Sequence, residues 1–206
     1  MLSKVARRGF AATVKQAAPL FKAPAYFNGL TTVDLESYRG KYVVLFFWPL
    51  DFTFVCPTEI TQFSDASKKF KDLNAEVIGV SVDSQFAHEK WSQQPRSEGG
   101  IGEMEIPLVA DLTKQISRDY GVLFEEMGVA LRGTFIIDKA GILRHSSIND
   151  LPIGRSVEES LRLVQAIKFN DENGDVCPAG WTPGKPTMEG SHTSEKTKSY
   201  WKKVMA

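Results

Sequence analysis

Continuous apolar runs alternate along the chain with stretches whose apolar residues recur at helical spacing. The run Tyr42–Trp48 is rich in Val, Leu and Phe, which is typical of a strand buried on both faces. In Pro57–Asn74 the apolar residues fall on one stripe, and proline suits a first helical turn, so we expect a helix there. The following pattern predicts further strands at Glu76–Asp83 and Ile106–Ala110 and further helices at Ser84–Gln94 and Thr113–Tyr120.

The second half of the chain adds a hairpin and a capped helix. The apolar segments Arg132–Asp138 and Ile142–Ile148 are joined by a short loop in which Gly141 supplies the turn. Ser156–Glu159 is a capping box, and apolar residues at helical spacing continue from it to about Asn170. Crossover helices make part of a sheet parallel and the hairpin makes part of it antiparallel. The sequence therefore predicts an α/β domain with a central mixed β-sheet flanked by helices.

The chain changes character after Asn170. Gly, Pro, Ser and Lys dominate up to about Lys198, so we expect an extended arm with little core of its own. Ser199–Val204 is expected to form one final helical turn. The predicted division is a domain over residues 11–170 and a C-terminal arm over residues 171–206.

The N-terminus has the composition of a targeting segment. Residues 1–33 contain basic residues but no acidic ones, and the first ten alternate basic and apolar positions near helical spacing. Mitochondrial transit peptides share this composition, and Arg8–Ala11 resembles a matrix-protease cleavage site. We expect residues 1–10 to be a transit peptide that directs the chain to the mitochondrial matrix. The alternative is a basic tail on a cytoplasmic protein.

Charge and cysteine content exclude several classes of protein. The 25 basic and 25 acidic residues balance, which gives no general reason to expect nucleic-acid or membrane-surface binding. The longest apolar run is too short to span a bilayer. Two cysteines are too few for a disulfide-built scaffold. With three scattered histidines they provide no local ligand pair, so we expect no metal site and no cofactor.

The segment Pro49–Glu59 follows a buried strand and opens a helix, a position at which α/β proteins bind ligands. Cys56 lies at the helix start, where unpaired N–H groups and the helix dipole favour a thiolate over a thiol. The Thr53 hydroxyl can form a hydrogen bond close to the sulfur, and Pro49 limits solvent access. A lone free cysteine is more often an inert core residue, so position alone leaves both interpretations open.

The spacing of Pro49, Thr53 and Cys56 resembles the active-site signature of the peroxiredoxins, Pro-x-x-x-Thr-x-x-Cys. The wider segment Phe46–Glu59 looks like that of the typical two-cysteine subgroup. The likeness continues in the same order through Ser81–Phe86, Pro107–Asp111, Arg132–Asp138 and Gly174–Trp181. It covers about residues 17–203, so the sequence is identified as a member of this family.

The resemblance implies a thioredoxin-like fold and assigns roles to individual residues. Cys56 would be the peroxidatic nucleophile, which peroxide converts to a sulfenic acid. Arg132 would place its guanidinium beside the thiolate, with Glu59 as a bidentate carboxylate partner. Arg155 matches the family's second active-site arginine, although its position before a helix cap also fits a surface residue. Cys177 would resolve the sulfenic acid as an interchain disulfide between the subunits of a homodimer.

The resemblance also implies partners. The substrates would be hydrogen peroxide and alkyl hydroperoxides, thioredoxin would be the reductant, and dimers could join into a ring such as a decamer. Sulfiredoxin is a further partner that the family suggests. The loop Gly99–Gly102 and the pair Tyr200–Trp201 resemble family segments that slow disulfide formation. Trp201 departs from the family pattern, which has Phe at this position, and the alternative for this pair is a frayed tail.

Two other functions are alternatives to a peroxidase. A cysteine hydrolase needs a histidine base close to Cys56, and none of the three histidines lies in a segment that suggests this role. A holdase chaperone, an activity that ring-forming peroxiredoxins can have, would not need Cys56.

Overall fold

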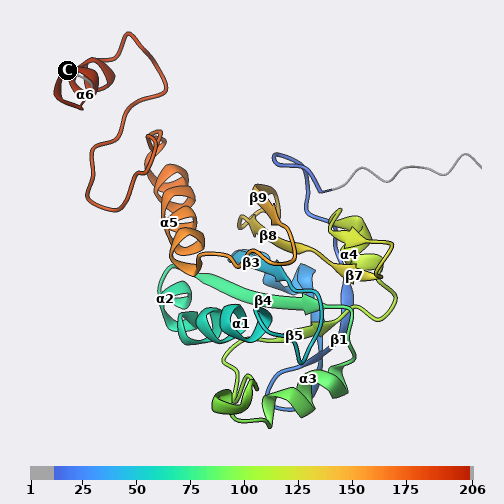
Figure 1. Ribbon diagram of the computed structural model, residues 1–206. Helices are drawn as coiled ribbons and strands as arrows, with labels where there is room; N and C mark the ends of the chain where they lie inside the picture. Colours follow the sequence, from blue (N-terminus) through green and yellow to red (C-terminus); the bar gives the residue numbers. More distant parts are fainter. Residues whose placement is uncertain (1–11, 205–206) are drawn as a thin grey trace, which may run out of the picture.

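The computed structural model describes residues 12–204, which form a seven-stranded sheet with helices on both faces (Figure 1). The strand order is β2-β1-β5-β4-β3-β8-β9. Strands β3, β4 and β5 run parallel, whereas β1, β2, β8 and β9 pair antiparallel with their neighbours. The mixed sheet predicted from the sequence is therefore confirmed. The strands are β1 (Lys22–Tyr26), β2 (Leu30–Asp34), β3 (Tyr42–Phe47), β4 (Ala75–Ser81), β5 (Leu108–Ala110), β8 (Arg132–Ile137) and β9 (Leu143–Asn149), with a separate pair β6 (Leu123–Phe124) and β7 (Val129–Ala130).

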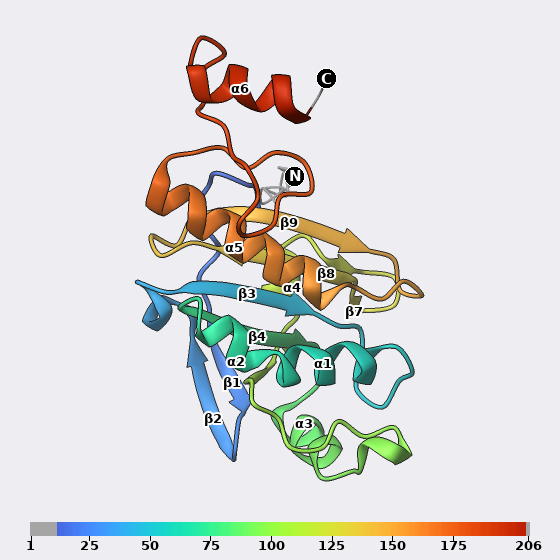
Figure 2. The same ribbon diagram turned by 90° about the vertical axis from the view of Figure 1, so that its left-hand side faces the viewer.

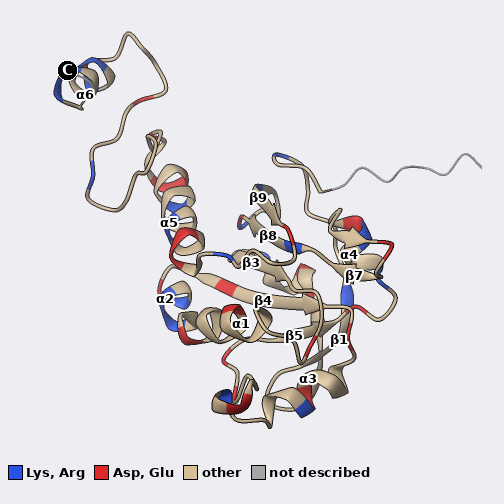
Figure 3. Cartoon of the chain, in the orientation of Figure 1, with Lys and Arg blue, Asp and Glu red and all other residues tan. Residues whose placement is uncertain are grey.

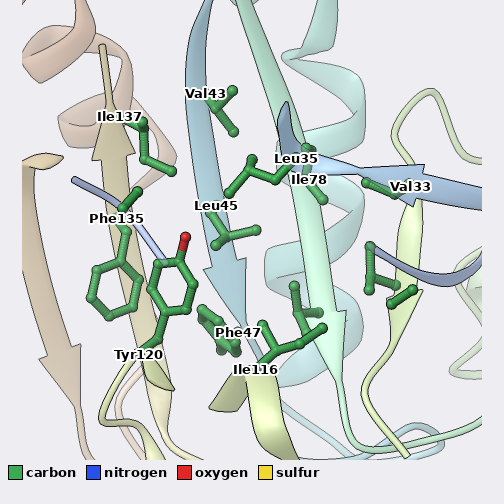
Figure 4. Packing of buried hydrophobic residues seen from close by; sticks show 14 of the residues in the cluster. Val33, Leu35, Val43, Leu45, Phe47, Ile78, Ile116, Tyr120, Phe135 and Ile137 are labelled. Atoms are coloured by element: carbon green, nitrogen blue, oxygen red, sulfur yellow. The ribbon is translucent and has the colours of Figure 1, made fainter. Parts of the chain in front are cut away.

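The central strand β3 is buried on both faces, which explains its unbroken apolar run. Its even-numbered residues, such as Phe46, belong to the apolar cluster that contains Cys56 and the inner faces of α1, α2 and α5. Its odd-numbered residues belong to the cluster on the opposite face. Figure 4 shows Leu45 and Phe47 of that second cluster close to Tyr120 and Phe135.

The helices are α1 (Cys56–Asp65), α2 (Ser67–Lys71), α3 (Gln85–Ser92), α4 (Gln115–Asp119), α5 (Val157–Asn173) and α6 (Glu195–Val204), with 3-10 turns at Leu35–Tyr38 and Arg96–Glu98. The single helix predicted over Pro57–Asn74 is wrong in one respect, because it is divided into α1 and α2. The break falls at Ala66, whose N–H contacts the carbonyls of both Gln62 and Ser64. No glycine or proline marks this position, so the sequence gives no warning of it.

The hairpin β1–β2 is the part of the sheet that the sequence pattern did not predict. Its turn contains Asn28 and Gly29, both with positive φ, which is a frequent hairpin signal. Pro24 lies inside β1. Because proline is rare in the interior of strands, the sequence pattern did not indicate a strand at this position.

The C-terminal arm is more ordered than predicted. Trp181 is 3% exposed and its ring lies 4.9 Å from that of Phe169 on α5. Helix α6 begins at Glu195, earlier than the expected final turn, because the Ser194 hydroxyl accepts a hydrogen bond from the Thr197 N–H. Figures 1 and 2 show α6 beyond α5, away from the sheet.

Acidic and basic residues are interspersed along the described elements (Figure 3). Within residues 12–204, no helix combines the length and apolar character needed to cross a membrane. The same range contains no group of three or more His, Cys, Asp or Glu side chains suited to a metal ion. The predicted transit peptide, residues 1–10, lies outside the described residues.

Candidate active site

Cys56 is the first residue of α1 and is fully buried. The preceding residue, Val55, provides no side-chain cap for the helix, and Pro57 occupies the first turn. The N–H groups of this turn and the helix dipole therefore present partial positive charge next to the sulfur.

Arg132 reaches the sulfur from the start of β8, the strand that pairs with β3. Its Nη1 donates to Cys56 Sγ at 3.3 Å and to Glu59 Oε2 at 2.7 Å. Its Nε donates to the Leu151 carbonyl at 2.7 Å. The guanidinium is thus fixed on both sides while one nitrogen faces the sulfur.

Glu59 holds a second arginine. The Nε and Nη2 of Arg155 donate to its two carboxylate oxygens at 2.8 and 2.9 Å, and the Arg155 main-chain N–H donates to Oε1 at 2.8 Å. The bidentate partner of Glu59 is therefore Arg155, whereas Arg132, for which we expected that geometry, contributes a single nitrogen. The surface alternative for Arg155 is wrong, since its side chain is only 4% exposed.

These side chains leave an excess of positive charge inside the protein. Two guanidinium groups share the single carboxylate of Glu59, and all three side chains are at most 4% exposed. An uncompensated buried charge is costly. Arg132 directs this excess positive charge at the sulfur of Cys56, which lies 3.3 Å from its Nη1.

A pocket of about 450 Å³ opens beside Cys56. Pro49, Thr53 and Arg132 line it, as the sequence motif suggested. The Thr53 hydroxyl donates to the Leu50 carbonyl at 2.9 Å, so its lone pairs remain to accept a hydrogen bond from a ligand. The other lining residues are mainly apolar: Leu50, Phe54, Val55, Met127, Val129, Leu151 and Pro152.

Cys177 lies outside this pocket, in the arm, where its Sγ is 3.7 Å from the carbonyl of Ala166 on α5. It is half-buried and, like Cys56, a free thiol. Burial raises the pKa of the Cys177 thiol, and the nearby Asp175 carboxylate adds to this rise while Arg162 opposes it. The chain therefore brings together all the predicted site residues except Cys177.

The comparisons with known proteins agree with this geometry. Residues 14–146 match the AhpC/TSA family, and residues 166–203 match the C-terminal domain of 1-Cys peroxiredoxin. The chain belongs to the AhpC/TSA family. It is 57% identical to the mitochondrial thioredoxin-dependent peroxide reductase of Mus musculus, over 93% of this chain and 74% of that protein. It is also 57% identical to peroxiredoxin-2 of Bos taurus, over 93% of this chain and 96% of that protein.

Solved structures that resemble this chain support the same family. The reduced 2-Cys peroxiredoxin of Plasmodium vivax superposes with a TM-score of 0.84 at 48% identity, covering 86% of this chain and 93% of that one. The chain is therefore a two-cysteine peroxiredoxin with the thioredoxin-like fold expected from its sequence.

One feature of this peroxiredoxin that the sequence motif did not predict is a buried pair beneath the active-site loop. Asp51 Oδ2 lies 2.7 Å from His88 Nδ1, and Asp51 Oδ1 accepts a hydrogen bond from Trp48 Nε1 at 2.9 Å. Asp51 thereby fixes the loop that carries Pro49 and Thr53. Asp51 belongs to the motif segment, but only the fold reveals that His88 of α3 is its partner.

Proposed function

We propose that this peroxiredoxin reduces hydrogen peroxide and organic hydroperoxides with the thiolate of Cys56. The observation that carries the proposal is the buried contact of 3.3 Å between Arg132 Nη1 and Cys56 Sγ, at the end of an open pocket. Relatives named peroxide reductases support the choice of substrate.

The first step follows from these positions. The Cys56 thiolate attacks one peroxide oxygen, the O–O bond breaks, and the other oxygen takes the bonding pair and a proton to leave as water or an alcohol. Sulfur is oxidised to a sulfenic acid while the peroxide is reduced by two electrons. Arg132 stabilises the negative charge that moves along the O–O bond, and Thr53 accepts a hydrogen bond from the peroxide. The apolar pocket wall leaves few alternative orientations.

The second step uses Cys177 of the partner subunit in a homodimer. Its sulfur attacks the sulfenic sulfur, an S–S bond forms, the S–O bond breaks, and hydroxide leaves with the thiol proton as water. A disulfide needs Cα atoms within about 7 Å, and Cys56 is buried at a helix start, so the first turn of α1 must unwind. Thioredoxin then reduces the disulfide. Dimers assemble further into a ring, and sulfiredoxin would repair a sulfinic acid at Cys56.

Stopped-flow consumption of hydrogen peroxide, with thioredoxin as the reductant, tests this proposal. We expect Cys56→Ser to abolish the reaction, because the nucleophile is lost. Cys177→Ser is the matched control, and it should keep the first turnover while losing thioredoxin-dependent recycling. Peroxide consumption by Cys56→Ser at the parent rate would show that another group reacts.

We also propose a location and a division of the chain. Residues 1–10 act as a transit peptide into the mitochondrial matrix, residues 11–170 form the peroxidase domain, and residues 171–206 form the arm with Cys177. Three mammalian relatives named as mitochondrial, at 56–58% identity, support the location. Sequencing the N-terminus of protein isolated from mitochondria should find about ten residues removed. A mature protein beginning at Met1, or one found only in the cytosol, would contradict the proposal.

A further inference from the structure

Asp175 lies two residues before Cys177 and is buried, with 8% exposure. Its carboxylate Oδ2 accepts hydrogen bonds from the Thr187 hydroxyl at 2.6 Å and from Lys196 Nζ on α6. Its main-chain carbonyl accepts a hydrogen bond from Asn170 Nδ2, near the end of α5, at 2.8 Å. One residue thus joins α5, the arm and α6 beside the second cysteine.

The surrounding contacts make this part of the arm a unit. Val176 and Met188 exchange two main-chain hydrogen bonds at 2.8 and 3.2 Å. Thr197, 3% exposed in the first part of α6, donates its hydroxyl hydrogen to the Glu189 carbonyl at 2.9 Å. Apart from this unit, α6 stands away from the sheet (Figure 1). Movement of α6 and movement of the Cys177 segment are therefore linked through few contacts.

We propose that Asp175 is a positioning residue that ties α6 to the segment carrying Cys177, and that this tie must open before Cys177 can reach the partner's active site. The proposal rests on the function proposed above, because it concerns how Cys177 leaves its place against α5. Cys177 Sγ faces the Ala166 carbonyl in the tied arrangement, so disulfide formation requires it to leave that contact.

The ion pair between Asp175 and Lys196 is the part of the tie that substitution can remove with least disturbance. The side chain of Lys196 is 44% exposed and the side chain of Asp175 is 11% exposed, so water partly screens the pair. Exposed ion pairs are weak, so the loss of this one should change the rate by only about two- to fivefold.

The test measures the rate at which the Cys56 sulfenic acid becomes the Cys56–Cys177 disulfide, by rapid quenching after one equivalent of hydrogen peroxide. We expect Lys196→Met and Asp175→Asn each to speed this step by about two- to fivefold. The double variant should be no faster than the faster single one, because both substitutions remove one interaction. The rate of the first step should not change, since neither residue lines the pocket at Cys56.

Lys198→Met is the matched control. Lys198 lies on the same helix with 45% side-chain exposure, and it pairs with Glu195 at 2.8 Å instead of with Asp175. This variant should form the disulfide at the parent rate. If Lys198→Met speeds disulfide formation as much as Lys196→Met does, the step depends on the charge of α6 in general and not on the contact between Asp175 and Lys196.

Asp175 also raises the pKa of Cys177, so Asp175→Asn alone cannot distinguish the tie from a change in thiol ionisation. Lys196→Met distinguishes them because it opens the tie and leaves the Asp175 carboxylate in place. If the Lys196→Met variant forms the Cys56–Cys177 disulfide at the parent rate, the inference is wrong. If the parent protein itself forms no Cys56–Cys177 disulfide, the proposed function fails instead.

Discussion

Arg132 illustrates how one buried side chain serves both structure and chemistry. Its Nε is fixed by the Leu151 carbonyl, and its Nη1 contacts both Glu59 and the sulfur of Cys56. A planar guanidinium can hold these directions at once, because its donors are rigidly spaced. An ammonium of the same charge provides donors on one atom only.

We therefore expect Arg132→Lys to slow the reaction of Cys56 with hydrogen peroxide by about 10- to 100-fold, although the charge is kept. Stopped-flow tryptophan fluorescence in a single turnover measures this rate. Arg118→Lys is the control, because Arg118 pairs with Glu125 with 45% side-chain exposure and does not line the pocket. A reaction of Arg132→Lys at the parent rate would show that charge alone is sufficient.

At this scale the sequence identified the residues of the site better than their pairing. The motif spacing and the order of the later segments selected Cys56, Glu59, Arg132 and Arg155, and the fold brings these four side chains together. The bidentate contact was assigned to the wrong arginine. That choice depends on the backbone before α5, since the Arg155 N–H itself donates to Glu59, and no sequence pattern specifies this path.

At the scale of elements, the loop Gly99–Gly102 is fastened to the helices around it. Trp91 Nε1 donates to the Gly99 carbonyl at 3.0 Å, and Arg96 Nε donates to the Ile101 carbonyl at 3.0 Å. The two Nη atoms of Arg96 also donate to the two carboxylate oxygens of Asp65, the last residue of α1. Arg96 therefore links the loop to the helix whose other end carries the reactive cysteine.

Gly100 has no room for a side chain in this loop. A Cβ at this position would lie 2.0 Å from the Gln94 carbonyl oxygen, a main-chain atom that cannot turn aside. We expect Gly100→Ala to lower the free energy of unfolding by about 1–3 kcal/mol, as overpacking does elsewhere. Urea denaturation followed by circular dichroism measures this change.

Gly190→Ala provides the comparison for that measurement, because the nearest atom to its added Cβ is Val176 Cγ1 at 4.0 Å. Its stability should stay within about 0.5 kcal/mol of the parent. If both variants unfold at the same urea concentration, the steric account of the Gly99–Gly102 loop is incorrect.

The elements that the sequence predicted best are those whose pattern reflects burial. Strand β3 and the hairpin β8–β9 lie within about one residue of their predicted bounds. The break between α1 and α2 was missed because Ala66 is itself a good helix former. The early start of α6 depends on a single hydroxyl cap at Ser194 within a polar segment, where periodicity carries little information.

For the whole molecule, the important feature is that the two cysteines lie in different parts of the fold. Cys56 lies at the start of α1, and Cys177 lies against α5 in the arm, outside the pocket that Cys56 faces. Within the described residues, the arm extends beyond α5 and away from the sheet (Figure 2). This arrangement suits an arm that delivers its cysteine to another subunit.

We therefore expect the disulfide to join different chains, and mixed dimers can test this. A chain carrying Cys56→Ser and a larger tag is coexpressed with an untagged chain carrying Cys177→Ser. Each mixed dimer then keeps one Cys56 and one Cys177 on different chains. After one equivalent of hydrogen peroxide, non-reducing electrophoresis should reveal a linked species whose mass is the sum of the tagged and untagged chains. Each variant alone should fail to form a Cys56–Cys177 link, because one cysteine of the pair is missing. If the mixed dimer also fails while the parent protein forms the link, resolution occurs within one chain, and the arm must fold back over its own α1.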